Sequence, residues 1–179
     1  TPNGGSASTA NTVTQSCTIA AVYNNATQAS SCNITSPKIT ASTNTPTVIG
    51  YNTSSSGTTS SWNQNTSKAV SSNATYYAIT KKDAKTVTIT FNRNGATSQT
   101  PSGGSASTAT TVNSSCTIAA TYNGVAQAST CNVTSPKITA STNTPTVVGY
   151  STSASGTSSS WNQSTAKAVS SNATYYAIT

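Results

Sequence analysis

The feature that most constrains this chain is an internal duplication. A shift of 99 residues aligns residues 1–80 with residues 100–179 without a gap, and 64 of the 80 aligned positions are identical. A tandem duplication predicts two copies of one small fold. We assign repeat copy 1 to residues 1–80 and repeat copy 2 to residues 81–179. Within copy 2, residues 81–85 are a basic connector and residues 86–99 a first strand and turn.

The strand predicted at the start of copy 2 has no counterpart in copy 1. Val87, Ile89 and Phe91 alternate with threonines, which is the pattern of a strand with one buried face. An Asn-Gly pair then predicts a turn, because both residues tolerate positive φ. Since the sequence begins at the counterpart of Thr100, we expect copy 1 to lack this strand. Upstream sequence or a neighbouring molecule would have to supply it.

The cysteines recur at identical spacing in the two copies, at Cys17, Cys32, Cys116 and Cys131. Four cysteines permit three pairings, and the duplication favours one disulfide within each copy. In copy 2 the midpoint of the pair is Asn123-Gly124, which predicts a type I′ hairpin turn with the two cysteines on opposite, paired strands. That position is wide for a direct bridge, so we expect a bulge or shifted register nearby. Structural disulfides also predict an oxidising, extracellular location.

The charged residues argue against an enzyme. The chain has no His and a single acidic residue, Asp83, against eight Lys and Arg residues, so its formal net charge is +7. Nothing is present to act as a general base, and a nucleophilic Ser or Cys would have no partner to activate it. The cysteines lack the companions of a zinc site. We therefore predict no catalytic residue, no cofactor and no metal.

The basic and aromatic residues suggest a surface ligand as an alternative. Most lysines stand singly among small polar residues, a spacing atypical of nucleic-acid binding, while the excess of positive charge would favour an anionic glycan or cell-wall polymer. The tryptophans could stack on sugars, although a chain this poor in large aliphatic residues needs them for its core. The candidate ligand contacts are Lys38, Lys68, Trp62, Lys137, Lys167 and Trp161.

No apolar stretch is long enough to span a bilayer, and the N-terminus lacks a signal-peptide pattern. We therefore expect no membrane insertion and place any secretion signal or anchor outside this sequence.

Several pieces of copy 2 occur in an order that is typical of a known bacterial repeat. They are VTITFNRNGA at 87–96, TYNG at 121–124, Pro136, VVGYSTSASG at 147–156 and SSNATYYAIT at 170–179. This order resembles the Listeria–Bacteroides repeat, also called the internalin B B-repeat, which occurs in tandem on surface proteins. The cysteine pair is not part of the usual pattern, and Thr179 stands where an aromatic residue commonly ends the last strand. The resemblance implies a small β-grasp-like spacer or adhesive domain without catalytic residues.

These observations predict a mainly β chain of two tandem β-grasp-like domains. Each would have an intradomain disulfide hairpin, a mixed sheet of about four or five strands, and little or no helix. The predicted function is a non-enzymatic extracellular structural or adhesive repeat, acting as a stalk or fibre spacer of a bacterial surface protein. Its partners would be neighbouring repeats and other copies in a fibre. The alternatives are a glycan- or wall-polymer-binding module and a self-assembling filament subunit completed by strand donation.

Overall fold

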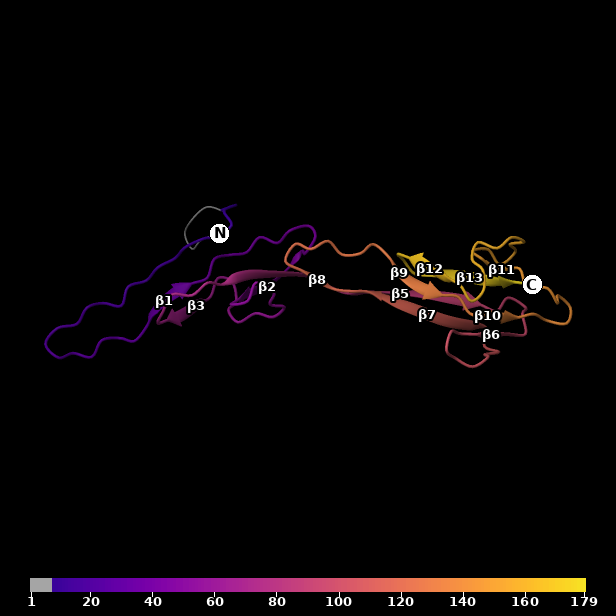
Figure 1. Ribbon diagram of the computed structural model, residues 1–179, viewed down its shortest axis with the longest axis horizontal. Coiled ribbons are helices and arrows are strands. Elements are labelled where there is room, and N and C mark those ends of the chain that lie inside the picture. Colours follow the sequence, from indigo (N-terminus) through magenta and orange to yellow (C-terminus); the bar gives the residue numbers. More distant parts are fainter. Residues whose placement is uncertain (1–7) are drawn as a thin grey trace. The chain divides into compact units, whose positions relative to one another are not determined.

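The computed structural model describes residues 8–179, and these residues form strands, turns and irregular segments without a helix (Figure 1). Two compact units are present. Unit 1 comprises Thr1–Asp83 and Ala120–Gln127, and unit 2 comprises Ala84–Ala119 and Ala128–Thr179. The predicted mainly β, disulfide-bridged fold is confirmed. The units differ from the predicted copies, because a short segment of copy 2 belongs to unit 1.

Unit 2 is organised around a mixed four-stranded sheet of order β11-β13-β5-β7. The central β5 and β13 are parallel, whereas both outer pairs are antiparallel. The first and last strands of the unit are thus neighbours in the middle of the sheet. These strands are β5 (Lys85–Asn92), β7 (Thr111–Ile118), β11 (Gly149–Ser151) and β13 (Ala173–Ile178).

Two smaller antiparallel sheets complete unit 2, and each pairs strands far apart in the sequence. They are β6 (Ser98–Thr100) with β10 (Lys137–Thr139), and β9 (Cys131–Thr134) with β12 (Ala166–Val169).

The core of unit 2 follows from the alternation in β5. Val87, Ile89 and Phe91 are all fully buried, and Phe91 packs edge-on against Tyr150 and Trp161, with ring centroids 4.8 and 5.3 Å apart. Burial of each such side chain contributes about 1.5–3 kcal/mol. A strand with period-two alternation therefore supplies the apolar layer on which the aromatic residues of the repeat pack.

The core of unit 2 also contains a buried polar contact. Gln99 Nε2 donates a hydrogen bond to the Tyr150 hydroxyl at 3.0 Å. Both side chains are fully buried, and this burial raises the pKa of Tyr150 well above its usual range.

Unit 1 has the same repeat sequence but less strand structure. It contains a two-stranded sheet and a three-stranded sheet of order β2-β4-β8. Residues 12–19, the counterparts of β7, form no strand, because the described part of this unit contains no strand equivalent to β5 with which they could pair. The strands are β1 (Cys32–Thr35), β2 (Thr47–Asn52), β3 (Ser67–Val70), β4 (Tyr77–Lys82) and β8 (Thr121–Tyr122).

The missing layer changes how the repeated aromatic residues are buried. In unit 2, Trp161 and Tyr175 are 4% and 9% exposed, and both contact Phe91. Their counterparts Trp62 and Tyr76 are only half-buried. Unit 1 therefore has the same side chains without the strands that cover them in unit 2.

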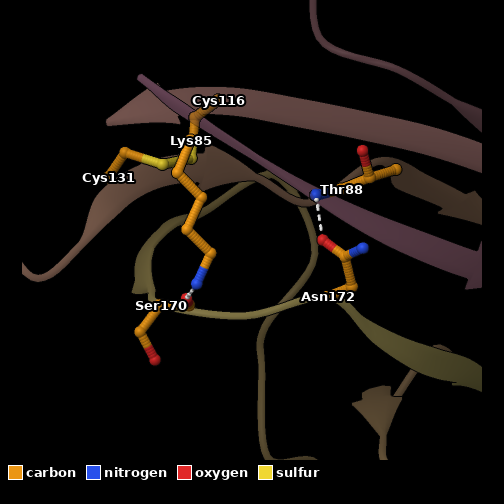
Figure 2. Close-up of a disulfide and its surroundings, with 6 residues drawn as sticks. All are labelled: Lys85, Thr88, Cys116, Cys131, Ser170 and Asn172. Atoms are coloured by element: carbon orange, nitrogen blue, oxygen red, sulfur yellow. Dashed lines mark hydrogen bonds between the residues drawn. A yellow bond between two sulfur atoms is a disulfide. The ribbon is translucent and has the colours of Figure 1, made fainter. Parts of the chain in front are cut away.

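The predicted basic connector is shorter than expected. Lys81 and Lys82 continue β4, and Lys85 already begins β5, so only two residues separate the strands. The correction has a local cause: Lys81 and Lys82 pair with β8, which extends β4 past the end of the repeat. The Lys85 ammonium donates to the Ser170 carbonyl at 2.7 Å and so holds the start of β5 within unit 2 (Figure 2).

Both predicted disulfides are present, with Cα atoms 5.9 Å apart in each. The predicted hairpin ladder between the cysteines of copy 2 is wrong. Cys116 lies on β7, which pairs with β5, and Cys131 lies on β9, which pairs with β12, so the disulfide joins two sheets (Figure 2). The ladders with β5 and β12 replace the hairpin. The turn itself is as predicted, with positive φ at Asn123 and Gly124 (54° and 82°).

Candidate functional site

The structure places one of the predicted lysines over the predicted tryptophan in each copy. In unit 2, Lys167 Nζ lies 5.3 Å from the ring centroids of both Trp161 and Tyr175, and it donates to the Ser160 carbonyl at 3.2 Å. Trp161 is buried within the core, so its ring has no open face for a sugar. The lysine instead lies over the two rings and stabilises the aromatic pair through cation–π attraction.

The same arrangement in unit 1 is more open. Lys68 Nζ lies 5.5 Å from the Trp62 ring and 4.9 Å from the Tyr76 ring, and it donates to the Tyr76 hydroxyl at 3.0 Å. All three side chains are half-buried. This cation–aromatic cluster is therefore partly accessible in unit 1.

The other two predicted contacts, Lys38 and Lys137, are exposed. Lys137 belongs to β10 and borders a cavity of about 180 Å³ together with Thr134 and Ser135. No shared binding surface follows for all six predicted residues.

The single carboxylate pairs with a neighbouring lysine. Asp83 Oδ1 lies 2.7 Å from Lys81 Nζ, and this hydrogen bond raises the pKa of Lys81. All four cysteines are disulfide-bonded, and the part of the chain that the structure describes contains no cluster of three His, Cys, Asp or Glu residues. Within that part, the arrangement offers polar recognition by hydroxyls, amides and backbone groups.

The most elaborate polar contact was not predicted from the sequence. It involves the copy 2 tip, which we define as Tyr122, Asn123 and Gly124. Tyr122 and the residue before it form β8, which pairs antiparallel with Lys81 and Lys82 of β4. The copy 2 tip therefore adds an edge strand to the sheet of unit 1, within which it belongs.

Asn123 makes hydrogen bonds with both its backbone and its side chain. Its backbone N–H donates to the Thr80 carbonyl at 2.9 Å, and its Oδ1 accepts from the Thr80 N–H at 3.2 Å. Its Nδ2 donates to the Ser55 carbonyl at 3.0 Å. An asparagine is suited to this position because its amide offers donor and acceptor on one short side chain that tolerates positive φ.

Gly124 completes the contact through its backbone. Its N–H donates to Thr45 Oγ1 at 3.0 Å, and its carbonyl accepts from Asn44 Nδ2 at 3.1 Å. Thr45 is fully buried, and its hydroxyl also bonds to the Thr80 hydroxyl at 2.7 Å. We call the residues that receive the copy 2 tip the copy 1 groove; they are Ser42, Asn44, Thr45, Ser55 and Thr80.

Copy 2 carries the same groove in an open form. Its residues, the copy 2 groove, border a cavity of about 410 Å³ and are Ser141, Asn143, Thr144, Ala154 and Thr179. The Thr144 and Thr179 hydroxyls lie 2.6 Å apart, and Ser141 Oγ lies 2.8 Å from Thr144 Oγ1. The hydroxyl arrangement of the copy 1 groove is thus reproduced, but here Thr144 is exposed.

The Asn-Gly pair was the available sequence signal for this site, and it correctly predicted the turn. It could not identify the groove, because those residues come from two loops and from β4, and their sequence is ordinary polar sequence.

Comparison with protein-family models, with curated proteins and with solved structures finds no match for the chain. Among residues 8–179, no helix is long and apolar enough to cross a membrane. The two disulfides indicate an oxidising environment.

Proposed function

We propose that this chain is a non-enzymatic extracellular structural repeat that forms part of a stalk or fibre of a bacterial surface protein. The contact between the copy 2 tip and the copy 1 groove is the observation that carries the proposal. It links a segment of one repeat to the body of the preceding repeat through backbone pairing and five further hydrogen bonds. A spacer needs successive repeats to be held together, and this contact supplies such a link.

The near-identity of the copies and their disulfides also support a structural role. Every groove residue whose side chain the tip uses is identical in the two copies. Ser55 is replaced by alanine in copy 2, but it contributes only its backbone carbonyl. Repetition of a groove and a tip in one chain is the arrangement from which a linear array is built. The resemblance to tandem surface repeats points to the same function.

The variant Asn123→Ala tests the proposal, with Asn24→Ala, the same position of copy 1, as matched control. Loss of the Asn123 side-chain bonds should speed hydrogen exchange at the Thr80 amide about tenfold or more, because each lost bond removes about 1 kcal/mol of protection. The control should leave that amide unchanged in dilute solution. Small-angle scattering of the same dilute samples should show greater flexibility for Asn123→Ala alone. Equal exchange at Thr80 in both variants would contradict the proposal.

A second candidate function, completion of unit 1 by strand donation, is favoured by one observation. The aromatic residues Trp62 and Tyr76 are half-buried, whereas their counterparts in unit 2 are buried and contact Phe91 of β5. A strand equivalent to β5 would pair parallel to the segment that precedes β4, as β5 pairs with β13.

A synthetic peptide with the sequence of β5 tests strand donation. Its binding should bury Trp62 and shift the fluorescence of a Trp161→Phe variant to shorter wavelength. A peptide with Val87, Ile89 and Phe91 changed to serine is the control. If both peptides leave the Trp62 emission unchanged, unit 1 is not an acceptor for this strand.

A further inference from the structure

We infer that the copy 2 groove of one molecule binds the copy 1 tip of a second molecule, so that chains associate head to tail. The copy 1 tip consists of Tyr23, Asn24 and Asn25, the counterparts of the docked residues Tyr122, Asn123 and Gly124. This inference rests on the proposed function, because it repeats between molecules the hydrogen bonds that Asn123 and Gly124 make within unit 1. The pairing of the docked tip with Lys81 and Lys82 has no counterpart among residues 100–179 and is not part of the inferred contact.

The copy 1 tip already has the shape of the docked tip. Asn24 and Asn25 have φ values of 56° and 61°, and the Ala26 N–H donates to the Tyr23 carbonyl at 3.2 Å. The docked tip closes the same turn with a bond of 3.1 Å. Tyr23 is 78% exposed, so the tip is accessible. A preformed turn loses little conformational freedom on binding.

The two tips differ at one position, and this substitution is compatible with the groove. Asn25 replaces Gly124, and a Cβ atom at Gly124 would meet only Ser42 Oγ at 4.0 Å, an ordinary van der Waals contact. Gly124 binds through its backbone N–H and carbonyl, which Asn25 also has. The key residue Asn24 is identical to Asn123.

The copy 2 groove has counterparts of the residues that bond to Asn123 and Gly124 in unit 1. Asn143, Thr144 and Thr179 match Asn44, Thr45 and Thr80, and the backbone carbonyl of Ala154 replaces that of Ser55. The exposed Thr144 contrasts with the fully buried Thr45, as expected for a groove without its tip. The groove contains no charged side chain, so the like charges of two molecules have no direct contact there.

One neighbour already uses part of the groove. Asn94 Nδ2 donates to the carbonyls of Ala154 and Ala177 at 2.9 and 3.0 Å. A carbonyl oxygen has two lone pairs and can accept a second donor, as the incoming Asn24 requires. Asn94 makes no bond to Thr144 or Thr179, and these hydroxyls remain open.

Such a contact joins different surfaces of two molecules and is therefore heterologous. A heterologous contact continues into open chains or closes into rings, according to the rotation between successive molecules. A chain that carries an exposed tip and a partly open groove thus has the two complementary surfaces that linear assembly needs. The partner we infer is a second copy of this chain.

Mixing two blocked variants provides the sharpest test. Asn24→Ala removes the tip amide and keeps the groove, whereas Thr144→Val removes the groove hydroxyl and keeps the tip. By sedimentation equilibrium, the unaltered chain should form oligomers as its concentration rises. Each variant alone should associate about tenfold or more weakly, because one or more hydrogen bonds are lost. An equimolar mixture should form dimers and nothing larger, since only one productive contact remains.

An Asn11→Ala variant, with an exposed asparagine changed outside the tip, should assemble like the unaltered chain. Circular dichroism and intact mass establish that each variant keeps its strands and disulfides. A monomer at all concentrations, or equal association of all variants and their mixture, would overturn the inference. The Thr80 exchange experiment concerns the tip within unit 1 and is read in dilute monomer, so it can succeed where this association fails.

Discussion

At the scale of single residues, the repeat depends on a few positions with no freedom to vary. Gly149 has φ of 135°, in the region that favours glycine. A Cβ atom there would overlap Ser159 Oγ and lie 2.9 Å from the Trp161 carbonyl. The Tyr150 amide donates to that carbonyl at 2.8 Å, so the close approach of the two backbones positions the tryptophan in the core.

Gly149→Ala should therefore destabilise unit 2 by about 2–5 kcal/mol, through backbone strain together with overpacking. Gly103→Ala is the matched control, because Gly103 also has positive φ but no atom within 4 Å of its added Cβ. It should cost about 1–2 kcal/mol from strain alone. Urea denaturation followed through amide signals of unit 2 measures both values. Equal losses would mean that the contact with Ser159 and Trp161 is unimportant.

Because Tyr150 is buried, we expect the stability of unit 2 to decrease at alkaline pH. Because burial raises its pKa in the folded state, the folded tyrosine keeps its proton at a pH where the unfolded tyrosine loses it. Stability is thus fully present below the ordinary tyrosine pKa of 10.0 and decreases as the pH rises above it. Stability curves measured across this range should fall more steeply for the unaltered chain than for Tyr150→Phe. Parallel curves would contradict the assignment.

At the scale of elements, the two disulfides close loops of the same length in different surroundings. Each spans a sequence separation of 15 residues. In unit 2 the bridge joins β7 to β9, whereas in unit 1 it joins the unpaired segment at Cys17 to β1. A cross-link stabilises a fold only to the extent that it restricts the unfolded chain more than the folded one.

Removing each bridge by paired Cys→Ala substitution should therefore have unequal effects. Loss of the Cys116–Cys131 bridge should cost about 3 kcal/mol, the value for a loop of this length. Loss of the Cys17–Cys32 bridge should cost clearly less, because its loop makes no strand pairs in the folded unit. Hydrogen exchange in denaturant, followed through amides of each unit, can measure the two losses of stability separately. Equal costs would indicate that residues 12–31 are as restricted as their counterparts.

At the scale of the whole molecule, one sequence repeated twice yields two units of unequal completeness. Unit 2 contains a cluster of buried apolar side chains built on β5, whereas the buried apolar side chains described in unit 1 are Ile39 and Ile79. Buried apolar area is the main favourable term in folding. The two units therefore differ in stability although their sequences are nearly the same.

Thermal unfolding should accordingly occur in two steps, with unit 1 unfolding at the lower temperature. The variants Trp161→Phe and Trp62→Phe each leave one tryptophan, in unit 1 and unit 2 respectively, so that fluorescence reports on one unit at a time. The Trp62 signal should change first. A single shared transition temperature for the two reporters would show that the units unfold together.

Local patterns in the sequence predicted the features that depend on neighbouring residues. The alternation of Val87, Ile89 and Phe91 predicted a strand, and positive φ at Asn123 and Gly124 was expected from their residue types. The spacing of the cysteines predicted their pairing. The strand partners of β7, β8 and β9 could not be predicted, because pairing depends on which sheet edge is open.

The segments 12–19 and 111–118 show the difference between what local sequence determines and what strand pairing determines. They are identical at six of eight positions, yet the second is β7 and the first forms no strand. The sequence alone determined the duplication, the alternation of strand residues, the turn and the disulfide pairs, because each arises from local chemistry or from spacing. Only the tertiary structure decided which copy becomes a complete sheet and where the hairpin tip binds, since a strand is stable only where a neighbouring edge satisfies its backbone hydrogen bonds.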